Sequence, residues 1–182
     1  MRNLADDVEK ILLTRDEIAE KVRELGAQIS ADFEGEEVIV ACVLRGAFVF
    51  CADLVRALTV PATIEFLSAS SYGKASVSSG NVQIKSDFEV DIHDKNVLLV
   101  EDIMDSGLTL NRLKEMLQVR QPRSLKIVAL LDKPERRRVD LQADYIGFTI
   151  PDEFVVGYGL DYASQYRQLP DIGVLKPEIY TA

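Results

Sequence analysis

The spacing of apolar residues changes repeatedly along the chain, and this alternation predicts an α/β fold. Apolar residues recur at helical spacing over stretches that predict helices at residues 14–32, 47–58 and 109–120. Short continuous apolar runs, typical of strands covered on both faces, occupy residues 37–44, 61–69, 97–100, 126–131 and 145–150. Residues 82–88 offer a further strand. Because strands alternate with helices, we expect a twisted, mainly parallel sheet flanked by helices.

The segments around these elements add detail. Thr14 and Glu17 have the spacing of a capping box, so the first helix should begin there. Residues 70–80 are rich in Ser and Gly and have little to bury, and we expect them to form a mobile loop. The segment from Pro151 onward, rich in Gly and Tyr, is expected to be irregular. No repeat or linker divides the sequence, so we expect one domain over residues 1–182.

Composition and charge argue against several classes of protein. The chain is 47% hydrophobic and 28% charged, which is typical of a globular domain. Its net charge of −9 argues against a nucleic-acid partner. The longest apolar run, residues 38–44, is far shorter than the roughly 20 residues of a membrane span, so no membrane partner is expected. Cys42 and Cys51 lie in apolar surroundings and predict reduced core thiols in a cytoplasmic protein.

The segment VLLVEDIMDSGLTL, residues 97–110, carries the clearest functional signal. A buried strand runs into Glu101 and Asp102, and a helix follows shortly after. Ligands of open α/β sheets bind beyond the carboxyl ends of the strands. Backbone N–H groups at the start of the helix form an anion site that fits a phosphate. Adjacent carboxylates suit the vicinal hydroxyls of a ribose. The predicted ribose-phosphate site comprises Glu101, Asp102, Asp105, Ser106, Gly107, Leu108 and Thr109.

A simpler interpretation is that Asp105 and Ser106 only cap the helix that follows. Capping explains one acidic residue, but it leaves Glu101 and Asp102 at the end of an apolar strand unexplained. Competing nucleotide motifs are absent from the sequence, which contains neither G-x-G-x-x-G nor a P-loop. We therefore favour a ribose phosphate as the ligand.

Residues 97–110 resemble the ribose-phosphate signature of the type I phosphoribosyltransferases. Members of that family bind phosphoribosyl pyrophosphate with Mg²⁺ and attach a nitrogenous base to carbon 1 of the ribose. The resemblance implies the type I phosphoribosyltransferase fold, in which a small hood is built from the C-terminal segment. In this chain the hood would lie mainly at about 144–182.

The same resemblance assigns roles to individual acidic residues. Glu101 and Asp102 would hold the ribose hydroxyls, and with Asp161 they would bind the metal ion. The backbone of Asp161 would also meet an exocyclic amine of the base. Asp105 would lie beside the purine N7 and act as the catalytic general acid and base.

Residues 43–47, VLRGA, resemble the pyrophosphate loop of the family. In such a loop the Leu44–Arg45 bond is cis and the backbone around Gly46 faces the pyrophosphate, whereas spacing alone favours an ordinary glycine turn. Arg45 stands where many relatives carry Lys, which keeps the charge and changes the donor geometry. The resemblance also implies that Arg167 reaches the pyrophosphate.

Ser71 and Tyr72 open the polar stretch at about 70–80 and resemble the lid of the family. A closed lid would exclude water from a transition state with positive charge on the ribose. Composition alone favours a solvated loop.

Residues 144–161, DYIGFTIPDEFVVGYGLD, resemble the base-binding hood of the hypoxanthine-guanine branch. There Phe154 stacks on the purine, and the backbone of Val155 reads the edge of the base. Lys133 matches the lysine that donates to the 6-oxygen of the purine. Glu153 departs from the pattern, because some relatives carry a basic residue at this position.

The resemblance therefore implies purine salvage. The 5-phosphoribosyl group would pass from phosphoribosyl pyrophosphate to hypoxanthine or guanine, giving IMP or GMP and pyrophosphate, in a homodimer or homotetramer. A xanthine- or pyrimidine-selective relative is the nearest alternative, although Lys133 argues against a pyrimidine. A regulatory RNA-binding protein of the same fold would need a basic face. The densest basic run, residues 136–138, is interpreted as a solvated loop.

Overall fold

The structure, a computed structural model, describes residues 3–71, 82–86 and 90–181. Within these ranges the main sheet has six strands in the order β4-β3-β2-β5-β6-β7. Neighbouring strands are parallel except β3 and β4, which confirms the mainly parallel sheet. The strands are β2 (Val38–Leu44), β3 (Ala62–Ser71), β4 (Val82–Ser86), β5 (Asn96–Met104), β6 (Ser124–Asp132) and β7 (Tyr145–Thr149).

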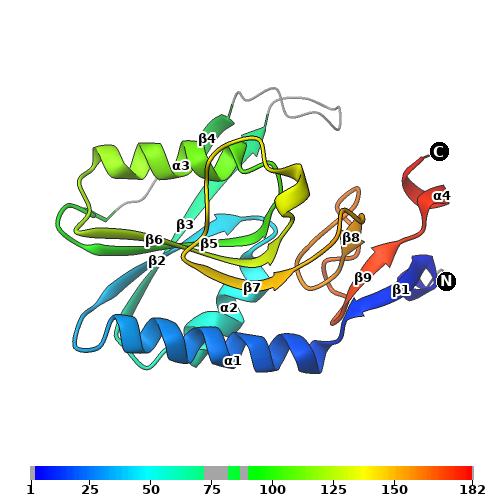
Figure 1. Cartoon of the computed structure of the whole chain (residues 1–182), viewed down its shortest axis with the longest axis horizontal. Helices are drawn as coiled ribbons and strands as arrows, with labels where there is room; N and C mark the ends of the chain where they lie inside the picture. The colour runs from blue at the N-terminus through cyan, green and yellow to red at the C-terminus, as the bar shows by residue number, and fades with distance from the viewer. Residues whose placement is uncertain (1–2, 72–81, 87–89, 182) are drawn as a thin grey trace.

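Helices cover both faces of this sheet, as Figure 1 shows. One face packs against α1 (Arg15–Asp32) and α2 (Phe48–Ala57), and the other packs against α3 (Leu108–Val119). The capping box at the start of α1 is confirmed, since the Thr14 and Glu17 side chains each accept from the other residue's backbone N–H. Cys42 and Cys51 are free thiols buried in the core on the α1 side, as expected.

The ends of three neighbouring strands form the edge that matters for function. β5 lies between β2 and β6, and both pairings are parallel. The carboxyl ends of these strands therefore reach the same edge of the sheet. β5 is longer than the predicted run of 97–100, because its pairing with β6 continues as far as Met104 opposite Asp132. Glu101 and Asp102 thus belong to the strand and not to the turn after it.

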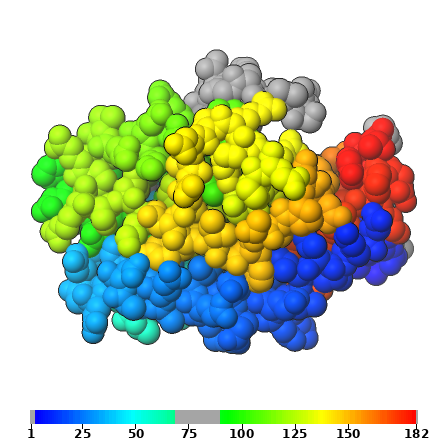
Figure 2. Space-filling view, viewed as in Figure 1, coloured from blue at the N-terminus to red at the C-terminus, as the bar shows by residue number. Residues whose placement is uncertain are grey.

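A second, smaller sheet lies at one end of the molecule. It has the antiparallel order β1-β9-β8, with β1 at Val8–Leu13, β8 at Val155–Val156 and β9 at Ile172–Leu175. Figure 2 shows the N- and C-terminal segments side by side at this end. The expectation of an irregular tail from Pro151 is wrong, because the tail contains β8, β9 and the short helix α4 (Pro177–Tyr180).

The hood boundary expected at about 144 also differs from the structure. β7 pairs with β6 in the main sheet, whereas the N-terminal strand β1 completes the small sheet. The polar stretch at 70–80 begins differently as well, since β3 extends to Ser71. Tyr72 and the rest of the expected lid lie outside the described residues. Among the residues that are described, no helix is long and apolar enough to cross a membrane.

Candidate active site

The acidic pair at the end of β5 is the electrostatic centre of the candidate site. Glu101 and Asp102 are partly buried, and the Asp102 carboxylate accepts from the Ile103 N–H at 2.7 Å. Burial raises the pKa of Glu101 well above its usual range, and the charge of Asp102 raises it further. Burial also raises the pKa of Asp102, against which the charge of Arg167 acts. The pair therefore favours a cation or hydroxyl donors as neighbours.

The backbone turns sharply between β5 and α3. Gly107 is the N-cap of α3 with φ of +78°, a left-handed conformation that glycine adopts without strain. A Cβ at this position would lie 2.9 Å from Val139 Cγ2. The first backbone hydrogen bond of the helix runs from Asn111 N–H to the Gly107 carbonyl at 2.8 Å, so the earlier N–H groups of the first turn have no carbonyl partner within the helix.

The structure also tests the simpler capping interpretation. No side chain caps α3 at Gly107, so Asp105 is not its cap and that interpretation is wrong for this residue. The Ser106 hydroxyl accepts from the Leu108 N–H at 3.4 Å, which is a weak local bond. The carboxylate of Asp105 is thus not occupied by the helix backbone.

Asp105 has an unexpected cationic neighbour instead. The Arg136 Nε lies 2.8 Å from Asp105 Oδ1, and the Arg136 Nη1 donates to Asp152 Oδ1 at 3.3 Å. Arg136 lies in the short 3₁₀ helix η2 (Pro134–Arg136), which follows β6. Arg136 itself is exposed, as expected for the run at 136–138, but its charge faces two carboxylates of the candidate site.

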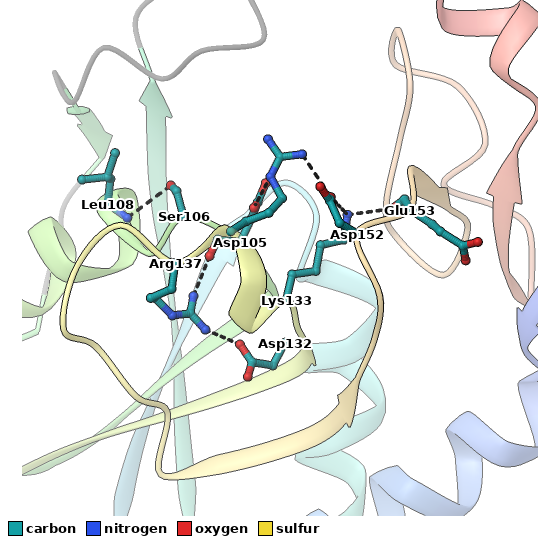
Figure 3. A network of polar contacts seen from close by, with 9 residues as sticks. Asp105, Ser106, Leu108, Asp132, Lys133, Arg137, Asp152 and Glu153 are labelled. Atoms are coloured by element: carbon teal, nitrogen blue, oxygen red, sulfur yellow. Dashed lines mark hydrogen bonds and ion pairs between the residues drawn. The ribbon is translucent and has the colours of Figure 1, made fainter.

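The expectation of a solvated loop at 136–138 is wrong for Arg137. Its side chain is only 16% exposed, and its guanidinium binds both the Asp132 carboxylate and the Asp105 carbonyl, the latter at 2.6 Å. Figure 3 shows Arg137 between these two groups. Arg136, Arg137 and Asp152 are site residues that the sequence analysis missed. Their charges alone did not reveal their partners.

Lys133 lies between the β5–α3 loop and the hood. It is 6% exposed, and its ammonium donates to the Glu153 carbonyl at 2.6 Å, with Asp152 Oδ1 at 3.8 Å. Burial lowers the pKa of Lys133, while the charges of Asp105 and Asp152 oppose that shift. The structure thus brings Lys133 close to the segment at 144–161, to which the resemblance assigns base binding.

The loop after β2 packs against the acidic pair. The Leu44–Arg45 peptide bond is cis, and Arg45 is exposed. A Cβ at Gly46 would overlap the Asp102 carboxylate, so only glycine fits at this point. A Cβ at Gly159 would in turn overlap the Gly46 carbonyl, which shows how closely the hood segment approaches this loop.

Arg167 joins this region to the hood. Its Nη1 donates to the Gly159 carbonyl at 2.6 Å, and its Nη2 lies 2.7 Å from Asp161 Oδ1. The other oxygen of Asp161 accepts from the Ser164 N–H at 2.8 Å. Asp161 is thus engaged on both oxygens, and Arg167 lies beside the loop at Gly46.

The family of the chain follows from comparison with known sequences. The family model of the phosphoribosyl transferase domain matches residues 10–163, which is most of the chain. The chain belongs to the phosphoribosyl transferase domain family.

Three relatives of this phosphoribosyltransferase show the extent of the similarity. It is 48% identical to the hypoxanthine-guanine phosphoribosyltransferase of Bacillus subtilis, over 96% of this chain and 97% of that one. It is also 48% identical to the bifunctional protein TilS/HprT of Listeria innocua, of which the match spans 28%. A crystal structure of a hypoxanthine phosphoribosyltransferase from Staphylococcus aureus has a TM-score of 0.95 at 45% identity, covering 98% and 97% of the chains. The type I phosphoribosyltransferase fold is confirmed.

Aromatic residues gather at the hood of this phosphoribosyltransferase. Phe154 is 39% exposed, and its ring stacks on Tyr180 with centroids 4.8 Å apart and 20° between the planes. Tyr162 meets Phe154 edge-on at 5.7 Å. Neither tyrosine was predicted as a site residue, because the sequence shows only that the tail is rich in Tyr. Val155 is buried in β8 beside Phe154.

Glu153, which departs from the pattern of the family, has a partner on β1. Its carboxylate accepts from the Lys10 ammonium at 2.6 Å. This pair links the N-terminal strand to the hood. Both side chains keep contact with solvent, so the ion pair itself contributes little to stability.

We expect the acidic pair of Glu101 and Asp102 to lower the stability of the folded protein. A group whose pKa is raised in the folded state lowers stability above that pKa, and the cost disappears as the pH falls through it. We expect Glu101→Gln to raise the melting temperature of the ligand-free protein at pH 8 by about 2–4 °C or more, the shift that 1 kcal/mol gives at this size. The gain should shrink toward pH 5.

Thermal unfolding across pH 5 to 8 measures this effect, with the exposed Glu34→Gln as a control that should change nothing. A lower melting temperature for Glu101→Gln at every pH would show that the pair is not under electrostatic strain.

Proposed function

We propose that the protein transfers the 5-phosphoribosyl group of phosphoribosyl pyrophosphate to hypoxanthine or guanine, giving IMP or GMP and pyrophosphate. Family membership supports the phosphoribosyl transfer, and the full-length relative from Bacillus subtilis carries the name of this activity. The activity is a step of purine salvage.

The position of Lys133 supports a 6-oxopurine, and not adenine, as the base. Its ammonium is buried at the entrance to the hood, next to the backbone that precedes Phe154. A buried ammonium with three donors and no acceptor favours a ligand that presents an oxygen. The 6-oxygen of hypoxanthine or guanine meets this requirement, and the 6-amino group of adenine does not. Phe154 would stack on the ring, and the Val155 backbone would read its edge.

The edge of the sheet supplies the remaining contacts. The N–H groups at residues 105–109 would hold the 5-phosphate, and Glu101 and Asp102 would hold the ribose hydroxyls. The loop at Leu44, Arg45 and Gly46, together with Arg167, would hold the pyrophosphate. Ser71 and Tyr72 would belong to the lid. These roles place the ribose between two anion sites, where positioning contributes most of the catalysis.

Glu101, Asp102 and Asp161 are the residues that would hold Mg²⁺, which neutralises charge on the leaving pyrophosphate when it is bound. Among the described residues, no group of three or more acidic, His or Cys side chains could hold a metal ion unaided. Glu101 and Asp102 nevertheless fit the ion, because Mg²⁺ usually takes one or two protein carboxylates together with substrate oxygens. Asp161 would have to exchange its contacts with Arg167 and Ser164 to join them. The raised pKa values of Glu101 and Asp102 also favour a cation near this pair.

The chemistry would centre on Asp105. As the bond from carbon 1 to pyrophosphate breaks, positive charge develops on the ribose, and the purine N9 attacks from the opposite face. Asp105 would accept the proton from N7. Arg136 Nε lies 2.8 Å from this carboxylate, so the base would have to displace or share that contact. Both side chains are about two-fifths exposed, and such a pair is weak enough to exchange.

Self-association is the remaining part of the proposal. Ile64 and Phe66 lie on one face of β3 and are 44% and 52% exposed. Their neighbours on β2, Val40 and Cys42, are fully buried on that face. A second copy would cover the exposed pair. Sedimentation should give a particle mass that is a multiple of the 20.3 kDa chain mass, and Phe66→Glu should reduce that particle mass. A parent protein that sediments as a monomer would contradict self-association.

Base selectivity tests the assignment of Lys133. An ammonium facing the amino group of adenine leaves both donors unsatisfied, at a cost of about 1–3 kcal/mol or more. We expect kcat/KM for adenine to be at least about 100-fold below that for hypoxanthine, using 1.4 kcal/mol per tenfold. Lys133→Gln should bring kcat/KM for adenine closer to that for hypoxanthine, because the amide of Gln can accept a hydrogen bond as well as donate one. The control Lys95→Gln, at an exposed position, should leave the ratio of the two kcat/KM values unchanged. Equal use of adenine by the parent protein would refute the assignment.

Asp105→Asn tests the general base. The change preserves shape and removes proton acceptance, and general acid–base help is typically worth about 10²–10⁴-fold. We expect kcat to fall about 10-fold or more, with phosphoribosyl pyrophosphate still bound and the fold intact. Single-turnover measurement shows any part of the defect that product release hides. The exposed Asp140→Asn is the matched control. If the single-turnover rates of Asp105→Asn equalled those of the parent protein across pH, Asp105 would have no catalytic role.

A further inference from the structure

Three successive backbone carbonyls, from the last residue of β5 into the turn before α3, accept hydrogen bonds from the segment that follows β6. The Met104 carbonyl accepts from the Lys133 N–H at 3.0 Å, and the Ser106 carbonyl accepts from the Arg138 N–H at 2.9 Å. The Asp105 carbonyl between them accepts from the Arg137 guanidinium at 2.6 Å. We propose that Arg137 is a positioning residue that aims the Ser106 N–H, in the middle of the 105–107 loop, at the 5-phosphate of the substrate.

The geometry of the peptide bond leads from the carbonyls to the N–H groups. In a planar trans peptide, the C=O of one residue and the N–H of the next point in opposite directions. The bonds of this loop are trans. Each carbonyl held by the 133–138 segment therefore aims the following N–H away from that segment. The N–H groups of Asp105, Ser106 and Gly107 are aimed in this way, toward the side where the proposed phosphate would bind.

Arg137 is the one side chain among these three donors, and its geometry suits the task. One arm of the fork binds Asp105 O and the other binds the Asp132 carboxylate at the end of β6, as Figure 3 shows. The sheet thus anchors the loop through two bonds from one planar group. The stem of Arg137 also lies along the loop, since a Cβ at Gly107 would be 3.2 Å from Arg137 Cδ.

Burial strengthens this anchor. The Arg137 and Asp132 side chains are 16% and 10% exposed, so their pair is little screened by water. If the Asp105 carbonyl lost its donor, the Asp105–Ser106 peptide would be free to rotate and its N–H would leave the cradle. The cost would fall on phosphate binding and not on the pyrophosphate loop, which belongs to the other side of β5.

The test compares two ligands that occupy different parts of the site, and it rests on the proposed function. Arg137→Lys keeps the charge for Asp132, but one ammonium cannot reproduce both arms of the fork. We expect the Kd of ribose 5-phosphate to rise at least about 10-fold, equivalent to 1.4 kcal/mol. The Kd of magnesium pyrophosphate should stay within about twofold. The control is Arg112→Lys on α3, whose side chain is 63% exposed.

The outcomes separate this inference from the proposed function. Unchanged affinity for ribose 5-phosphate, or equal weakening for both ligands, would overturn the role of Arg137. A parent protein that neither binds ribose 5-phosphate nor uses phosphoribosyl pyrophosphate would overturn the proposed function itself. If Arg137→Lys does not fold, the neutral pair Asp132→Asn/Arg137→Gln replaces it. The same selective loss is expected there, and parent-like binding of ribose 5-phosphate would refute the inference.

Discussion

The parallel pairing of β5 with both β2 and β6 is the constraint on which the rest of the structure depends. Parallel strands end at the same edge, so this pairing brings three chain segments together that are far apart in sequence. They are the loop at Gly46, the acidic pair with the turn into α3, and the segment from Lys133. The close fit of Gly46 against Asp102 shows how tightly the pairing holds the first two. Helices α1, α2 and α3 bury the faces of the sheet, and the hood lies beside the edge formed by the carboxyl ends of these strands.

This edge concentrates charge that the protein does not balance alone. Glu101 and Asp102 are held in a partly buried position with raised pKa values, and Lys133 is held in a position that lowers its pKa. Asp105 Oδ1 is buried and accepts no hydrogen bond, although the Arg136 guanidinium lies 2.8 Å away. Buried groups with perturbed pKa values in one place are typical of a catalytic site. A ligand with hydroxyls, an anionic phosphate and an oxopurine would offer further partners to the acidic pair, to the N–H groups at the start of α3 and to Lys133.

Local patterns predicted the main sheet, its helices and the position of the acidic pair, because continuous apolar runs and a capping box reflect burial and hydrogen bonding within short segments. The small sheet was not predicted for two reasons. Its strands β1 and β9 are far apart in the sequence, and the strands of this sheet are short and partly polar. The end of β5 was placed too early because only the pairing with β6 extends it to Met104. Arg136 and Arg137 resembled a solvated loop, and only the fold shows that carboxylates face them.

The central claim is that the 5-phosphate of the substrate binds at the loop of residues 105–109. Titration of isotopically labelled protein with ribose 5-phosphate, followed through backbone amide NMR signals, locates this site residue by residue. We expect the largest shifts at Ser106, Gly107 and Thr109, and no shift at Lys95, which lies at the opposite edge of the sheet. Largest shifts away from the 105–109 loop, with that loop unchanged at saturation, would contradict that claim.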